Sequence, residues 1–401
     1  MTRPTAERRP GATRALVVAT LAFLVAFVAW GLFSPLAPVF RELYGLSATQ
    51  VGLLVAVPVV LGSVARIPLG LLTDRFGGRV VFTALFLVLL VPLALAGLTR
   101  SYASLLGVGF LLGLAGASFA IGVPFVVRWF PPERQGVALG VYGMGNVGTA
   151  IAGLVAPRVA DAAGWPAAFW MLLPLMAAMA AVTWLFGRDA PGFVPSRRPL
   201  TASFAVLARR PLSVVLCLFY FVSFGGFVAI GTYLPTLLVS AYGLDRVDAA
   251  TRASGFVAVA TLARPLGGYA ADRWGGAQVL NAVFAVVALF AIVLAFQPGI
   301  AVITVAFLGT AFMLGLGNGA VFKLVAEHFA GEAGTVTGLV GAAGGLGGFF
   351  PPLLMGAVYD ATGDYAIGFM LLSELALVCL ISNVLVLQRR AEHLMPGPAD
   401  R

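Results

Sequence analysis

Long apolar stretches recur along the whole chain, and short polar connections separate them. Each stretch has about 18 residues or more, which at about 1.5 Å per residue is enough to cross the roughly 30 Å hydrocarbon core of a bilayer. The pattern predicts an all-α membrane protein with twelve spanning helices. Their approximate ranges are 15–38, 49–72, 79–98, 103–127, 136–158, 167–187, 211–240, 250–271, 277–297, 299–326, 333–358 and 365–387.

The composition excludes an ordinary soluble protein. Of the 401 residues, 60% are hydrophobic and only 10% are charged, which is more apolar surface than a soluble core can bury. The basic residues before the first apolar stretch resemble a secretory signal, but the stretch exceeds about 20 residues and lacks a clear small-residue cleavage site. We therefore expect a first helix that is retained.

In a soluble protein, the net charge of +9 would suggest nucleic acid as a partner, but here the charges follow the predicted topology. With both termini in the cytoplasm, 18 of the 25 Lys and Arg residues fall in cytoplasmic segments, five in outer loops and two within helices. This asymmetry satisfies the positive-inside rule. We expect a multi-pass protein of the bacterial cytoplasmic (inner) membrane, monomeric and surrounded by lipid. Cys217 and Cys379 fall in predicted helices without other ligands nearby, so no metal, disulfide or cofactor is expected.

The longest polar connection, 188–210, divides the chain into two parts of similar length. It contains five arginines and three prolines and lies between the sixth and seventh predicted helices. We expect an N-terminal six-helix bundle over 1–187, a cytoplasmic linker over 188–210 and a C-terminal six-helix bundle over 211–401.

An internal repeat supports this division. A shift of 198 residues places 261–276 on 63–78, with identical residues at seven of the 16 positions, including Arg66 with Arg264 and Asp74 with Asp272. The same shift carries three glycines of the fifth helix onto three of the eleventh. These are Gly136, Gly140 and Gly143, matched with Gly334, Gly338 and Gly341. A duplicated unit with two parallel halves is the plan of many secondary transporters.

Several segments resemble a known family. The loop GLLTDRFGGR (70–79) is similar to the loop between helices two and three of the major facilitator superfamily. More narrowly, ARIPLG (65–70), GMGNVG (143–148), GLGNGAVFKLVAEHF (315–329) and GGFFPPLLMG (347–356) together resemble the nitrate/nitrite porter family. The resemblance implies two pseudo-symmetric bundles that transport nitrate, nitrite or both by alternating access.

Two arginines lie deep within predicted spans. Arg66 is eight residues before Asp74, which places it about 12 Å inside the membrane, and Arg264 occupies the same depth in the other half. An arginine at the bilayer centre costs about 2.5 to 3.5 kcal/mol on insertion scales. One alternative is that the side chains extend to the membrane interface, but this would not require equal depth in both halves. The other is pairing with a buried acid, but the one deep carboxylate, Glu374, cannot neutralise two arginines. The pair therefore predicts an anion site whose negative charge comes from the substrate.

The shape of the guanidinium group narrows the class of anion. Its planar fork donates parallel hydrogen bonds to coplanar oxygens, and it keeps its charge. Nitrate, nitrite, formate, bicarbonate and short carboxylates all fit this description. The choice of nitrate and nitrite comes from the resemblance, and an exchanger for another small anion such as formate or oxalate is the alternative.

The resemblance also implies the other substrate contacts. Asn146 matches an asparagine at the substrate site of nitrate porters. Tyr220 would donate a hydrogen bond to the anion, and Phe224 and Phe119 would confine it between two opposed rings. Such rings would admit a flat ion and exclude tetrahedral sulfate or phosphate.

A further group of residues is expected to act in gating or helix packing. The glycines allow helices to approach closely and slide, although packing alone also explains them. Charged residues near the cytoplasmic helix ends are expected to form interhelix contacts that stabilise an outward-open state. For Lys323, the alternatives are that it steers anions or that it only caps a solvated helix end beside Glu327 and His328. The group comprises Gly143, Gly145, Gly341, Gly344, Asn318, Lys323, Asp74, Arg75, Asp272 and Arg273.

Other function classes find little support in the sequence. There are two histidines, no GxxxxGK[ST] loop and no nucleophile with an adjacent base, so neither an enzyme nor a primary pump is expected. Bringing a monovalent anion into a negative-inside cell is opposed by about 2.3 kcal/mol per 100 mV, so uptake must be coupled. Antiport of nitrate against nitrite and symport with protons both remain open, and Glu374 is the one deep acid for the latter.

Overall fold

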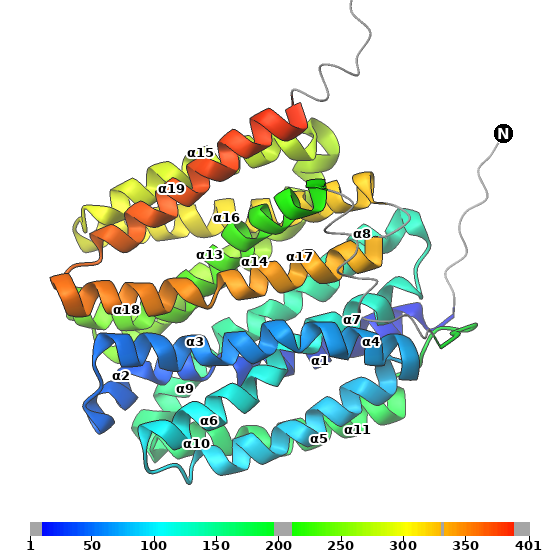
Figure 1. Cartoon of the computed structure of the whole chain (residues 1–401). Helices are drawn as coiled ribbons and strands as arrows, with labels where there is room; N and C mark the ends of the chain where they lie inside the picture. The colour runs from blue at the N-terminus through cyan, green and yellow to red at the C-terminus, as the bar shows by residue number, and fades with distance from the viewer. Residues whose placement is uncertain (1–9, 196–210, 330–332, 389–401) are drawn as a thin grey trace, which may run out of the picture.

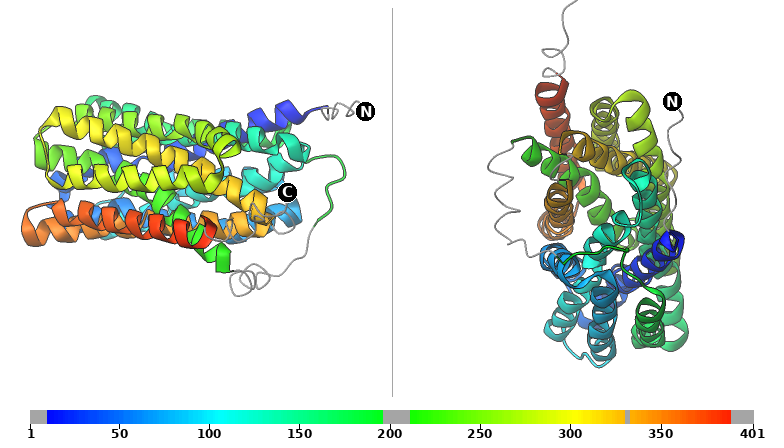
Figure 2. Two further views of the ribbon diagram at one scale, coloured as in Figure 1. Left: turned by 90° about the horizontal axis from the view of Figure 1, so that it is seen from above. Right: turned by 90° about the vertical axis from the view of Figure 1, so that its right-hand side faces the viewer.

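The computed structural model describes residues 10–195, 211–329 and 333–388, and within these ranges the chain is helical with no strand. Two bundles lie side by side, α1 to α11 in one and α13 to α19 in the other (Figure 1). The views of Figure 2 show that the long helices of both bundles run roughly parallel to one axis. This arrangement confirms the predicted all-α fold with two groups of spanning helices.

The first bundle, here called the N bundle, consists mainly of broken helices. They are α1 (Ala12–Trp30), α2 (Phe33–Tyr44), α3 (Ala48–Val64), α4 (Arg66–Phe76), α5 (Gly78–Ala96), α6 (Tyr102–Leu112), α7 (Ser118–Val127), α8 (Pro132–Gly143), α9 (Val147–Ala163), α10 (Trp165–Trp170) and α11 (Leu172–Phe186). Short 3₁₀ turns, Gly113–Ala117 and Met144–Asn146, join α6 to α7 and α8 to α9.

The second bundle, the C bundle, consists mainly of continuous helices. They are α13 (Pro211–Tyr242), α14 (Arg246–Trp274), α15 (Gly276–Ala295), α16 (Ile300–His328), α17 (Ala333–Gly347), α18 (Phe350–Thr362) and α19 (Ala366–Asn383), which ends in a π turn, Val384–Gln388. Of the described residues, eleven stretches are long and apolar enough to span a membrane. The other long helix, α14, carries Arg264 and charged residues at both ends, so its composition is more polar although its length of 29 residues suffices.

The internal repeat is visible in the backbone. Gly45 and Gly243, which are 198 residues apart, have φ angles of 61° and 63°, and Gly77 and Gly275, again 198 apart, have 85° and 87°. Each of these glycines follows the last residue of a helix, where a left-handed or extended positive-φ conformation ends the hydrogen-bond ladder at little cost for glycine only. The two halves therefore share their helix ends as well as their sequence register.

The bundles contact each other chiefly at one end, here called the far end, where α2 ends and α3 begins. The carboxylate of Asp360 in α18 accepts hydrogen bonds from the backbone N–H groups of Ala48 (2.9 Å) and Thr49 (2.7 Å), and so caps a helix of the opposite bundle. Arg246 of α14 forms an ion pair with Glu42 of α2.

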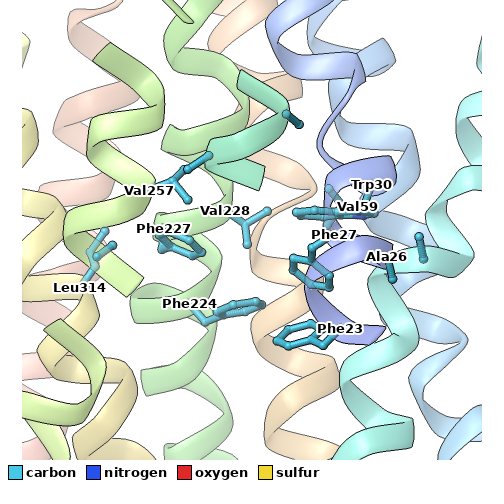
Figure 3. Close-up of a cluster of buried hydrophobic side chains, with 14 of the residues drawn as sticks. Phe23, Ala26, Phe27, Trp30, Val59, Phe224, Phe227, Val228, Val257 and Leu314 are labelled. Atoms are coloured by element: carbon cyan, nitrogen blue, oxygen red, sulfur yellow. The ribbon is translucent and has the colours of Figure 1, made fainter. Parts of the chain in front are cut away.

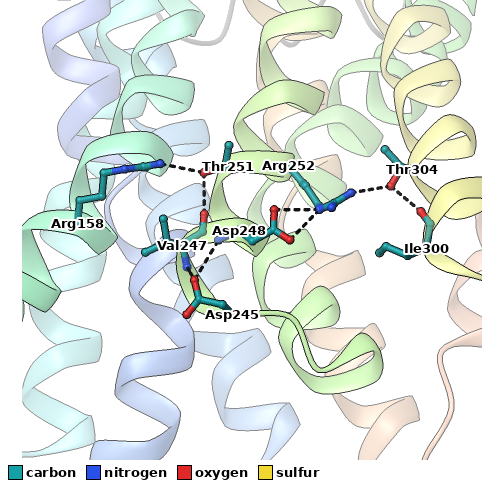
Figure 4. A network of polar contacts seen from close by, with 8 residues as sticks. All are labelled: Arg158, Asp245, Val247, Asp248, Thr251, Arg252, Ile300 and Thr304. Carbon is teal, nitrogen blue, oxygen red and sulfur yellow. Dashed lines mark hydrogen bonds and ion pairs between the residues drawn. The ribbon is translucent and has the colours of Figure 1, made fainter.

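A polar network strengthens this end of α14 (Figure 4). Asp245 caps α14 through the N–H of Val247 (2.9 Å), and Arg252 donates to both oxygens of Asp248 at 3.1 Å. Arg158 of the N bundle reaches across to the hydroxyl of Thr251 at 3.4 Å. Together with the Asp360 cap, these contacts hold the far ends of the two bundles together.

At the opposite end, here called the linker end, the ion pairs of the described residues stay within one bundle. Asp74 pairs with Arg128, and Asp272 pairs with Lys323 at 2.6 Å. Four repeat-related glycines on α8 and α17 have open space beside them, because a Cβ built on any of them would meet no atom within 4 Å. They are Gly140, Gly143, Gly338 and Gly341, of which Gly143 and Gly341 are buried. The structure is thus closed at the far end, whereas the described ion pairs at the linker end do not join the bundles.

Candidate functional site

Arg66 lies between the two bundles at a break in its helix. It begins α4 directly after Ala65, and Pro68 two residues later lacks the N–H that would bond to the carbonyl of Val64. The side chain is 7% exposed. Its Nη1 donates to the carbonyl of Gly341 in the C bundle at 2.5 Å, and its Nε donates to the carbonyl of Gly116 at 3.5 Å. Arg66 is therefore hydrogen-bonded, but by neutral groups.

Arg264 faces the same region from the C bundle and has fewer partners. Its Nε and Nη2 atoms are buried and donate to no acceptor among the described residues. Its guanidinium carbon lies 5.1 Å from the ring centre of Phe224 and 5.5 Å from that of Phe227. Two strong donors are thus left unsatisfied beside an aromatic wall, a state that costs free energy unless a ligand supplies acceptors.

The ring of Phe224 brings the two arginines together. The guanidinium carbon of Arg66 is 5.3 Å from this ring centre, so both arginines lie within cation–π range of one side chain. No Asp or Glu of the described residues is buried. Glu374 is exposed on α19, which lies at the edge of the C bundle (Figure 1). The two positive charges therefore have no buried counter-ion within the part of the chain described.

Tyr220 completes this side of the site. Its ring is stacked on that of Phe224, with the centres 5.0 Å apart and the planes 3° apart, and its hydroxyl lies beside the Arg264 guanidinium. Glycines of α17 make room for these groups. A Cβ on Gly344 would come within 2.2 Å of the Tyr220 ring, and one on Gly345 would lie 3.0 Å from Nη1 of Arg66.

Phe119, which the sequence analysis places opposite Phe224, contacts two rings of its own bundle. Phe119 packs within the N bundle, against Phe23 (centres 5.6 Å apart) and Tyr142 (5.7 Å). Phe23, from α1, is the ring that points toward Phe224 from the opposite bundle (Figure 3). Phe119 is half-buried and Phe23 is fully buried, so Phe23 is a further ring beside the site that the sequence analysis did not name.

Tyr142 is a second residue that the sequence analysis missed. Its side chain is fully buried, and its hydroxyl donates to the carbonyl of Ser118 at 2.9 Å. The ring stacks on Phe23 at 4.9 Å, and Gly122 has no side chain where the ring passes, since a Cβ there would lie 2.2 Å from it. One signal was available: Tyr142 directly precedes the GMGNVG segment.

Asn146 is buried, and it lies between the two arginines and the far end of the bundles. Its Nδ2 donates to the carbonyl of Gly143 at 2.9 Å, and its Oδ1 has no partner among the described residues. It lines a small cavity of about 30 Å³ between the bundles, together with Trp30, Thr232 and Ser254. This volume is that of about one water molecule in the liquid.

A group of unpartnered polar atoms also lies in the C bundle near Arg264. Both side-chain groups of Asn318 are buried without a partner among the described residues, as are the hydroxyls of Ser223 and Thr261. Asn318 is one helical turn from Phe322, whose ring contacts Tyr220 at 4.9 Å. Such orphaned groups are rare in native proteins, and a bound ion or water is one explanation for them.

The residues expected in gating fall into two groups. Gly145 and Gly344 make close contacts, since a Cβ on Gly145 would lie 2.3 Å from Phe23, whereas Gly143 and Gly341 have open space beside them in this structure. The acids form interhelix pairs, but with partners that the sequence did not suggest. Asp74 binds Arg128, Asp272 binds Lys323, Arg75 lies over the ring of Phe76, and Arg273 is exposed.

Comparisons with known proteins agree with this geometry. The family model described as Major Facilitator Superfamily matches residues 19–352 and 216–401. The fold is similar to that of a bacterial homolog of the human lysosomal transporter Spinster, in an inward-facing and occupied conformation (TM-score 0.73, 17% identity, 98% of this chain and 100% of that chain). It is also similar to the human organic anion transporter MFSD10 (TM-score 0.74, 18% identity, 94% and 100%).

Curated relatives are considerably more similar in sequence. The nitrite extrusion protein of Bacillus subtilis is 43% identical over 366 residues, which cover 91% of this chain and 92% of that protein. The probable nitrate/nitrite transporter NarK2 of Mycobacterium tuberculosis is 42% identical (90% and 93%). The probable nitrate transporter NarT of Staphylococcus aureus is 38% identical (92% and 94%).

Two bundles of membrane-spanning helices have two arginines between them, Arg66 buried and Arg264 half-buried. With the family match and the curated relatives, this defines a multi-pass membrane transporter and not an enzyme. The chain belongs to the Major Facilitator Superfamily and, within it, to the nitrate/nitrite porter family.

Proposed function

We propose that this protein exchanges nitrate for nitrite across the bacterial cytoplasmic membrane by alternating access. The observation that carries the proposal is the position of Arg66 and Arg264, from different bundles, over the single ring of Phe224, with two donors of Arg264 unpartnered. A planar monovalent anion between them would satisfy these donors and neutralise charge that is costly in a membrane. The names and the identity of the curated relatives support nitrate and nitrite as that anion.

The roles of the surrounding residues follow from their positions. Tyr220 donates a hydrogen bond to the anion beside Arg264, and Phe224 and Phe23 bound it on two sides. Asn146 lines the path toward the far end, and Phe119 packs against Phe23. Asn318 provides a further amide on the C-bundle side.

The bundles are the two moving bodies of this proposal. We take them as residues 1–187 and 211–401, joined by a linker over 188–210, of which 196–210 lie outside the described residues. The positive-inside rule places the linker end in the cytoplasm. The structure then corresponds to a state that is closed toward the outside, and the linker end, where the described ion pairs do not join the bundles, supports release to the inside.

Exchange is favoured over proton symport by the charges at the site. An empty site keeps two positive groups close together in a poorly solvated space, so returning without an anion is unfavourable. A symporter needs a titratable acid that communicates with the substrate. Glu374 is exposed on α19, and no carboxylate in the described ranges is buried.

The test is nitrate flux in proteoliposomes that contain the purified protein. Labelled nitrate is supplied outside, with internal nitrite, with no internal anion, or with a pH gradient alone. Exchange predicts uptake only with internal nitrite. Uptake driven by the pH gradient in nitrite-free vesicles would replace antiport by symport, and flux of formate or oxalate without nitrate flux would favour the alternative substrate.

A further inference from the structure

A cavity of about 400 Å³ lies between the bundles at the far end, separate from the central arginines. Its walls come from the last turns of α2 and from the facing part of α13, and include Pro38, Arg41, Glu42, Thr236 and Val239. We call it the vestibule. It is far larger than the ~30 Å³ that one water molecule occupies in the liquid, so it has room for an anion with part of its hydration shell.

The vestibule lies on the axis that relates the two halves. The repeat shift of 198 residues places Pro38 on Thr236, which line opposite walls. Beneath it, the hydroxyl of Ser34 donates to the carbonyl of Thr232, its own repeat partner, at 2.6 Å. Residues that contact their own symmetry mates lie close to the symmetry axis. Because Arg66 and Arg264 are repeat partners too, the same axis passes between them.

One positive charge in the wall of the vestibule has no ion-pair partner. Arg41, in the last turn of α2, forms no ion pair with a carboxylate of the described residues, although Glu42 lines the same cavity. The adjacent carboxylate, Glu42, is taken by Arg246. The repeat partner of Arg41 is Val239, so the positive charge stands on one wall only.

A hydroxyl donor is also left over in the wall of this cavity, beneath its surface. Thr236 is 1% exposed, and its buried Oγ1 has no hydrogen-bond partner among the described residues. A threonine within a helix usually donates to the carbonyl four residues earlier, as Thr232 does to Val228 at 2.8 Å. For Thr236 that carbonyl belongs to Thr232, which already accepts the hydroxyl of Ser34.

We propose that the vestibule is a second, outer binding site for the small oxyanion. Arg41 supplies the charge, and the hydroxyl of Thr236, which is buried in this closed state, supplies a hydrogen bond once the far ends begin to separate. The inference rests on the proposed function for the identity of the anion. One arginine and one hydroxyl hold an anion more weakly than two arginines, so this site captures the anion on the axis and passes it inward when the far ends separate. The competing explanation is that Arg41 only stabilises the C-terminus of α2.

The test compares the two sides of the membrane in right-side-out vesicles. Arg41→Gln is expected to raise the KM for external nitrate by about three- to tenfold, with the maximal rate and the KM for internal nitrite unchanged. Thr236→Val should shift the external KM in the same direction by a smaller factor, and Arg41→Lys should restore most of it. Arg100→Gln is the matched control, because Arg100 is an exposed arginine at the same end and outside the vestibule.

Three results would overturn the outer site. An external KM within twofold of wild type in Arg41→Gln would show that the vestibule captures nothing. An equal rise in Arg100→Gln would reduce the effect to the general surface charge. A lower melting temperature with unchanged KM values would assign Arg41 to helix stability. If Arg41→Gln does not fold, the external KM values of Thr236→Val and Arg41→Lys decide instead. Absence of nitrate flux in the wild-type protein is a different outcome, because it would reject the proposed function itself.

Discussion

Arg66 and Arg264 lie over the same aromatic ring although they come from different bundles, with their guanidinium carbons 5.3 and 5.1 Å from the centre of Phe224. Their hydrogen bonding is unequal. Arg66 donates to the carbonyl of Gly341 across the interface, whereas Nε and Nη2 of Arg264 have no partner in the described part of the chain. A bound anion would accept hydrogen bonds from Nε and Nη2 of Arg264. It would also compete with the carbonyl of Gly341 for the guanidinium of Arg66, and so affect a contact between the moving bundles.

The first prediction concerns the shape of the cationic groups. Arg66→Lys and Arg264→Lys keep the charge but lose the planar fork, so each should lower nitrate kcat/KM by at least about tenfold, because a hydrogen bond to a charged group is worth about 1.5 to 3 kcal/mol. Initial rates in nitrite-loaded proteoliposomes give the value. Arg79→Lys, at a surface arginine that contacts Trp184, is the control. Near-normal transport in both site variants would leave only a generic positive cavity.

The second prediction concerns the wall between the arginines. Phe224→Leu keeps an apolar side chain but removes the π face, and each cation–π contact is worth about 0.5 to 2 kcal/mol. We expect weaker nitrate binding by about three- to thirtyfold, measured by isothermal titration of the purified protein. Phe219→Leu, on the same helix but packed against Phe284, should bind normally. Equal losses in the two variants would mean that helix packing, not the site, was perturbed.

The third prediction separates glycines by the space beside them. A Cβ on Gly148 would lie 2.2 Å from the carbonyl oxygen of Leu24, so Gly148→Ala should lower thermal stability markedly. Gly140→Ala and its repeat counterpart Gly338→Ala meet no atom within 4 Å and should fold with normal stability.

Transport by the latter two variants tests the motion. If α8 and α17 close against the opposite bundle in the other state, a methyl group on either glycine obstructs that closure and slows exchange. Normal exchange in both Gly140→Ala and Gly338→Ala would show that these surfaces stay open throughout the cycle.

The fourth prediction concerns the closed far end. Asp360→Asn weakens the cap that the C bundle places on α3, a contact worth about 0.5 to 2 kcal/mol, and should shift the population toward a state open at the far end by about two- to thirtyfold. The readout is the labelling rate of a cysteine at Val257, which lines the small cavity below. Asp364→Asn is the control, since Asp364 bonds to Gln297 and Ala366 within its own bundle. Unchanged labelling would show that Asp360 does not hold this end shut.

The sequence predicted the helical fold, the repeat register and the two deep arginines because each of these leaves a direct trace in the pattern of residues. Hydropathy places the spans, and Arg66 and Arg264 violate it at matching positions. Helix α14 is the exception, because its charged residues make it more polar than the eleven stretches with a membrane-spanning composition. Its position in the internal repeat is what indicates that it also spans the membrane.

The ring opposite Phe224 could not be found in this way. With 30 phenylalanines in the chain, no local pattern distinguishes Phe23 from the rest. Its place depends on how α1 packs against the turn between α8 and α9, where a Cβ on Gly145 would lie 2.3 Å from its ring. The partners of Asp74 and Asp272 were missed for a related reason. Arg128 and Lys323 lie about 50 residues away in sequence and come near only through the packing of helices within each bundle.

The central claim is that the bundles exchange sides only with an anion between the two arginines. Its most direct test is nitrate uptake into nitrite-loaded proteoliposomes at membrane potentials set 100 mV apart. One-for-one exchange moves no net charge, so the account predicts equal rates within about twofold, and no uptake without internal anion. Net anion movement would meet about 2.3 kcal/mol per 100 mV. A several-fold dependence on potential, or uptake into anion-free vesicles, would contradict the account.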